Sequence, residues 1–114
     1  EQCNRMIEGL RNKMRIKAFE SAMLFYRMED YRASAVTLQH LLVEYPDLEE
    51  REKIRWLIVD SFHKLASNSI ESKKAARFES VLEAHQALSE EFPRSSYLPQ
   101  SQALAEQART FLKF

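Results

Sequence analysis

The apolar residues of this chain recur at three- and four-residue steps from one end to the other, which is the period of an amphipathic α-helix. Asp30 is placed to cap a helix and Pro46 to end it. Asp47 and Glu50, three residues apart, are typical of a capping box at the next helix start. The pattern predicts an all-α fold of five helices, at roughly residues 3–28, 31–44, 48–67, 72–92 and 96–113.

An internal repeat relates the second and fourth predicted helices at an offset of 47 residues. Tyr31 matches Phe78, and Tyr-Pro at 45–46 matches Phe-Pro at 92–93, so each copy is expected to open on an aromatic residue and close on aromatic-proline. Each copy follows a longer helix. This favours a helix–turn–helix unit used twice, as in an α-solenoid, over chance similarity between two amphipathic helices.

The first unit also fits the pattern of the tetratricopeptide repeat, which has about 34 residues. With Pro46 at the terminal proline, Ala22 and Ser34 fall on small positions, and Ser34 on the one where the two helices cross. Phe25 and Tyr31 fall on aromatic positions. The second unit fits less well, because an insertion around residues 68–75 lengthens it. We expect one tetratricopeptide-like domain with repeat one, repeat two and a closing helix at about 3–46, 47–93 and 96–113.

The composition narrows the classes of function. Lys plus Arg and Asp plus Glu each number 17, so zero net charge gives no general attraction to nucleic acid. The single glycine, Gly9, cannot supply a glycine-rich phosphate loop. One cysteine, Cys3, excludes an internal disulfide and a thiolate metal site. No apolar run approaches the ~20 residues that span a bilayer, and the expected piece is soluble.

The histidines are the remaining source of chemistry. Asp60-x-x-His63 has the spacing of half of a carboxylate–histidine iron motif, but a di-iron bundle needs two such halves and two more carboxylates. His85 is expected at a partly buried helix crossing, and His40 belongs to no motif. We therefore predict no catalytic centre, no metal and no cofactor.

The first helix carries two sets of candidate partner-binding residues. Arg11 and Arg15 share one face, either as a solvated surface or as an electrostatic rim for an acidic partner. Phe19, Met23 and Tyr26 also recur at helical steps and fall on the concave, ligand-facing positions of a tetratricopeptide. They are either binding anchors or side chains that pack against the neighbouring repeat.

Several segments together carry a family resemblance that covers essentially all 114 residues. They are residues 10–14, Phe25-Tyr26, Asp30-Tyr31, Tyr45-Pro46-Asp47 and Asn68-Ser69-Ile70. They resemble the C-terminal half of the BamD family, the tetratricopeptide lipoproteins of the outer-membrane β-barrel assembly (Bam) machine. The resemblance implies a non-catalytic scaffold on the periplasmic face of the bacterial outer membrane. It also implies binding to the POTRA region of the barrel-forming subunit and to other Bam lipoproteins.

The same resemblance implies a lipid anchor that this chain does not supply. Cys3 follows Glu-Gln inside a predicted helix and lacks the small and apolar residues that precede a lipidated cysteine. We expect a piece of a longer protein, in which an anchor lies outside these residues. The alternatives are another tetratricopeptide adaptor, from the cell envelope or linked to a chaperone, and a small helical metal-binding protein or enzyme.

A flank of the first helix has no predicted cover within the chain. Met6, Ile7, Leu10 and Met14 lie on this flank, and the later helices can reach only one side of it. We expect these side chains to be exposed in the single chain or buried by a second copy.

Overall fold

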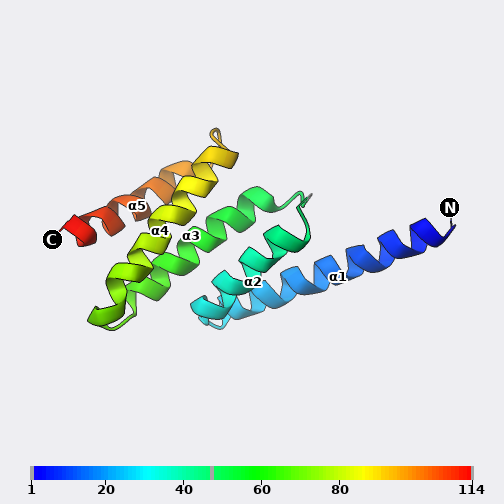
Figure 1. Cartoon of the computed structure of the whole chain (residues 1–114), viewed down its shortest axis with the longest axis horizontal. Helices are drawn as coiled ribbons and strands as arrows, with labels where there is room; N and C mark the ends of the chain where they lie inside the picture. Colours follow the sequence, from blue (N-terminus) through cyan, green and yellow to red (C-terminus); the bar gives the residue numbers. More distant parts are fainter. Residues whose placement is uncertain (1, 47, 114) are drawn as a thin grey trace.

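Five α-helices make up the computed structural model, which describes residues 2–46 and 48–113, with side chains for 8–46 and 48–112 (Figure 1). Their bounds are α1 Gln2–Arg27, α2 Tyr31–Glu44, α3 Arg51–Ser67, α4 Glu71–Glu91 and α5 Leu98–Lys113. The predicted all-α fold is confirmed, and most helix ends fall within one or two residues of the predicted ones.

The helices form an elongated stack of 60 × 29 × 18 Å. Each helix packs on the next one along the chain, and α3 also contacts α5. One apolar core lies between α1, α2 and α3, and a second lies between α3, α4 and α5, so α3 serves both. Because α1 has 26 residues and α2 has 14, the N-terminal half of α1 projects beyond α2 (Figure 1).

Local hydrogen bonds fix the turn between α1 and α2. Glu29 adopts a φ of 64°, and its N–H donates to the Tyr26 carbonyl, while the Asp30 N–H donates to the Phe25 carbonyl. This pair of bonds is a Schellman motif, which satisfies the last carbonyls of α1. The Asp30 carboxylate then accepts the Ala33 N–H at 3.3 Å, so the predicted N-cap of α2 is confirmed.

The predicted capping box before α3 is wrong in its placement. Helix α3 begins at Arg51, three residues later than predicted, and Glu50 is its N-cap without a side-chain capping bond. The Glu50 carboxylate instead accepts hydrogen bonds from Arg15 of α1. Asp47 lies outside the described residues. The Glu50 side chain therefore forms a long-range ion pair instead of the predicted cap.

The 47-residue register holds at the ends of α2 and α4. The C-cap residues Tyr45 and Phe92 have φ/ψ angles of −127°/75° and −130°/72°. The Tyr45 N–H donates to Leu41 O at 2.9 Å, and the Phe92 N–H donates to Leu88 O at 2.8 Å. The two aromatic residues thus end their helices in the same way.

The predicted aromatic start is correct for α2 and wrong for α4. Helix α2 begins at Tyr31, whereas α4 begins at Glu71 and holds Phe78 in its interior. The insertion predicted around residues 68–75 is largely helical. The turn after α3 takes up only residues 68–70, and the rest of the insertion forms the start of α4. The Arg77 guanidinium donates to Ser69 Oγ and joins this added part of α4 to the turn.

Candidate partner-binding surface

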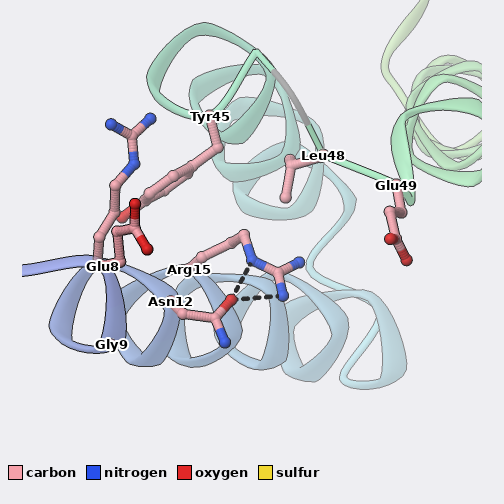
Figure 2. A pocket seen from close by; sticks show the side chains of 8 residues that line it. Glu8, Gly9, Asn12, Arg15, Tyr45, Leu48 and Glu49 are labelled. Carbon is pink, nitrogen blue, oxygen red and sulfur yellow. Dashed lines mark hydrogen bonds between the residues drawn. The ribbon is translucent and has the colours of Figure 1, made fainter. Parts of the chain in front are cut away.

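An open groove of about 750 Å³ lies between α1 and the connection from α2 to α3 (Figure 2). The projecting half of α1 forms one wall, and Tyr45, Leu48 and Glu49 form the other. The remaining lining residues are Glu8, Gly9, Arg11, Asn12 and Arg15. The sequence alone identified the two arginines but not the second wall, which tertiary packing supplies.

Arg15 is held by partners within the chain. Its guanidinium donates to Asn12 Oδ1 at 3.0 and 2.8 Å, as Figure 2 shows. It also donates to both carboxylate oxygens of Glu50, at 3.2 and 3.0 Å. This ion pair joins α1 to the start of α3, so Arg15 helps to shape the groove.

Arg11 presents its charge to the groove. Its guanidinium lies over the Tyr45 ring, 5.4 Å from the centroid, in a cation–π arrangement. One N–H donates to the Glu44 carbonyl at a long 3.4 Å. A guanidinium has five N–H donors, so most of those on the exposed Arg11 are directed to solvent and can bind a partner's carboxylate.

The apolar candidates Phe19, Met23 and Tyr26 pack against the core between α1, α2 and α3, where each is half-buried. The structure brings them together with the neighbouring helices rather than into the groove. They therefore make the packing contacts that the sequence analysis offered as the alternative. Binding of a partner through their exposed parts stays a prediction.

Tyr26 also belongs to a polar cluster that joins α1 to α3. Its hydroxyl donates to the Asp60 carboxylate and accepts a hydrogen bond from Lys64 Nζ at 3.1 Å. Lys64 Nζ lies 3.0 Å from Asp60 Oδ2 and faces the rings of Tyr26 and Tyr31, at 5.0 and 5.4 Å from their centroids. Sequence reasoning missed this cluster, because its members are 34 or more residues from Tyr26.

The cluster favours fully protonated tyrosine and lysine. Burial raises the pKa of Tyr26, and the hydrogen bond to Asp60 raises it further. Burial by itself would lower the pKa of Lys64, but its hydrogen bonds to Tyr26 and Asp60 and the Asp60 charge outweigh burial and raise it. Neither group is poised to exchange a proton near neutral pH, so the cluster is an interhelical tie.

Two of the three histidines, His85 and His63, have structural partners. His85 is buried between α4 and α5, and its Nδ1 lies 2.6 Å from Ser101 Oγ, so its predicted place at a helix crossing is confirmed. His63 Nε2 lies 2.8 Å from Gln107 Oε1. Asp60 pairs with Tyr26 and Lys64 rather than with His63. Across the residues that the structure describes, no group of three or more His, Cys, Asp or Glu side chains could hold a metal ion.

The expected exposure of the α1 flank is confirmed for Leu10 and Met14, which are 62 % and 57 % exposed. The side chains of Met6 and Ile7 lie outside those that the structure describes. Leu10 and Met14 line a second, smaller groove of about 390 Å³ together with Arg11, Glu44 and Tyr45.

No protein-family model matches the chain, and no curated protein matches it by sequence. In the described part of the chain, no helix is both long and apolar enough to cross a membrane.

Proposed function

We propose that this chain is a non-catalytic, tetratricopeptide-like scaffold that binds a protein partner through the groove between α1 and the α2–α3 connection. The observation that carries the proposal is the exposed Arg11 guanidinium, held over Tyr45 at the edge of an open groove of about 750 Å³. The Arg11 cation lies beside the Tyr45 ring and the exposed side chains of Leu10 and Met14. Such a combination can bind a protein surface that presents both carboxylates and apolar groups.

The stack of helices supports the scaffold interpretation. Two helical hairpins with the same C-terminal geometry follow one another at a 47-residue offset, and contacts run between near neighbours. Such an arrangement is typical of solenoids, which offer extended binding surfaces.

The proposed partner comes from the resemblance of residues 10–14 and 45–47 to the BamD family. Accordingly, we propose the POTRA region of the barrel-forming Bam subunit as the binding partner. The proposed location is the periplasmic face of the bacterial outer membrane.

Binding of the purified chain to purified POTRA domains, measured by isothermal titration calorimetry, tests this function. We expect Arg11→Glu to weaken binding about tenfold, because it places a carboxylate against an acidic surface. Lys13→Glu is the matched control: it makes the same charge change on an exposed residue of α1 that does not line the groove. Its dissociation constant should stay within about twofold of the unsubstituted chain, apart from general charge effects.

Two results would contradict the proposal in different ways. Absence of binding to the POTRA domains would remove the assignment to outer-membrane assembly. Equal weakening by Arg11→Glu and Lys13→Glu would show that general charge, and not the groove, drives the association.

A further inference from the structure

One face of α1 carries an exposed stripe with the spacing of a coiled-coil seam. Its members follow one another at steps of four, three, four, three and four residues, the a/d spacing of a heptad repeat. All of them are exposed, and the four apolar ones are at least half exposed. This stripe, hereafter the α1 seam, consists of Leu10, Met14, Lys17, Ser21 and Leu24 of α1 and of Met28, the residue that directly follows α1.

We propose that the α1 seam pairs with the α1 seam of a second copy of this chain in an antiparallel, two-fold symmetric dimer. The argument is the order of residues along the seam, which is symmetric about Phe19. Reversing one copy places Leu10 opposite Met28 and Met14 opposite Leu24 of the second copy. It also places the single charged member, Lys17, opposite the small polar Ser21.

The parallel arrangement lacks this complementarity. It would place Lys17 against Lys17 at the centre of the interface, where two like charges lose water and repel each other. It would also put Ser21 against Ser21, leaving two adjacent layers without an apolar contact. The heptad spacing favours a helix as the occupant, and the residue order favours a reversed copy of the same helix.

The shape of the surface agrees with this pairing. At the Leu10–Met14 end, α1 and Tyr45 enclose the smaller groove of about 390 Å³. At the other end, Leu24 and Met28 protrude, with 50 % and 67 % of their surface exposed. In the antiparallel dimer, Leu24 and Met28 of the second copy enter the groove of the first, and the two-fold axis repeats this contact.

The seam is also accessible in the folded chain. The core contacts of α1 come from residues on another face of the helix, namely Ala18, Phe19, Ala22, Met23 and Tyr26. The N-terminal half of α1, which carries Leu10 and Met14, projects from the stack (Figure 1), and the four remaining seam residues are exposed as well. The seam is about 27 Å long at 1.5 Å per residue, short enough that we expect a reversible dimer with a micromolar dissociation constant.

Sedimentation equilibrium of the 114-residue chain tests for the dimer. We expect Met14→Glu to raise the dissociation constant at least about tenfold, because a carboxylate would face Leu24 of the second copy. Ile16→Glu is the matched control, since Ile16 is an exposed apolar residue of the same helix outside the seam. Circular dichroism of both variants confirms that α1 remains folded.

Ser21→Glu distinguishes the two orientations. In the antiparallel dimer it creates two ion pairs with Lys17 and should tighten association several-fold. In a parallel dimer it would place two carboxylates together and weaken association.

Disulfide trapping provides an independent readout, in a Cys3→Ser background. Chains that carry Met14→Cys should cross-link to chains that carry Leu24→Cys, and neither should cross-link to itself. Self-linking of either variant, or a strictly monomeric chain at high concentration, would overturn the proposal. So would Met14→Glu abolishing binding to POTRA domains in a monomeric chain, because the seam would then belong to that partner. A chain that binds POTRA domains but does not dimerise contradicts this inference alone. A chain that dimerises but does not bind POTRA domains contradicts the proposed function alone.

Discussion

Asp60 of α3 accepts from both the Tyr26 hydroxyl of α1 and Lys64 Nζ in the polar cluster that joins the two helices. Replacing Asp60 with Ala removes the acceptor for the Tyr26 hydroxyl and for Lys64 Nζ. Its side chain is only 12 % exposed, so water replaces these bonds poorly. A hydrogen bond to a charged group contributes about 1.5–3 kcal/mol.

The two bonds of Asp60 are not equal in effect. Lys64 is 41 % exposed, so solvent screens its ion pair with Asp60, and this pair adds little to the free energy of unfolding. Most of the loss comes from the Tyr26 hydroxyl, which is left without its acceptor in a half-buried position. We expect Asp60→Ala to lower the free energy of unfolding by about 2–3 kcal/mol, and Tyr26→Phe by about 1 kcal/mol. The double variant should lose less than the two single losses combined, because both remove the same bond.

Urea unfolding at neutral pH, followed by circular dichroism, measures these losses. Glu83→Ala is the control, since Glu83 is an exposed carboxylate in a helix interior. If Asp60→Ala costs no more than Glu83→Ala, or if the two losses in the double variant simply add, the cluster does not tie the helices together.

The same cluster predicts a loss of stability in alkaline solution. The pKa values of Tyr26 and Lys64 are both raised by folding, so the folded chain holds these protons more tightly than the unfolded chain. The contribution of these two groups to the free energy of unfolding is complete below their unfolded-state pKa values, near 10, and declines as the pH rises above them. Asp60→Ala should flatten this alkaline decline.

Three further predictions concern single positions. Glu29→Gly should raise the free energy of unfolding by about 1 kcal/mol in urea titrations, because Glu29 has a φ of 64°, whereas Glu29→Ala should give no such gain. The hydrogen bond from Arg51 is the chief cause of the lowered pKa of Glu91. Glu91 therefore stabilises the fold at pH values above its unfolded-state pKa, and this stabilisation is lost as the pH falls. In thermal unfolding measured over a series of pH values, Glu91→Gln should make the loss of stability in acid less steep. Ser34 Oγ and Ser61 Oγ lie 3.2 Å apart in the core, so either Ser→Ala change alone should cost about 1 kcal/mol and the double change should be nearly neutral by calorimetry.

The sequence predicted the helices well because their signals are local. The three-to-four spacing, the Asp30 cap and the aromatic-proline ends each act within a few residues. The apparent box at Asp47 and Glu50 failed for a physical reason: Arg15, 35 residues earlier in the chain, pairs with the Glu50 carboxylate. A capping pattern reports only the hydrogen bonds that a side chain can make to nearby residues. It carries no information about a partner that tertiary structure brings close.

The candidate site was predictable only in part for the same reason. Spacing placed Arg11 and Arg15 on one face of α1, and the structure has both lining one groove. Spacing could not show that Arg15 is neutralised by Glu50 while Arg11 faces outward over Tyr45. Nor could the spacing decide whether Phe19 faces a ligand or the next helix, since either role places an apolar side chain at the same helical period.

The α2–α3 and α4–α5 pairs, which are related by the 47-residue offset, show what the packing of neighbouring helices depends on. At the crossing of α2 and α3, Ser34 faces Ser61, both fully buried. The residues 47 positions later are Val81 and Ala108, which are fully buried in the core between α3, α4 and α5. A hydrogen-bonded pair and an apolar pair thus occupy corresponding places between corresponding helices. Modest side-chain volume at the crossing, rather than one chemistry, is therefore what lets the helices approach. Since each helix packs on the next one along the chain, a change in the groove can reach the second core through α3 and through Ala84 of α4, which packs against both cores.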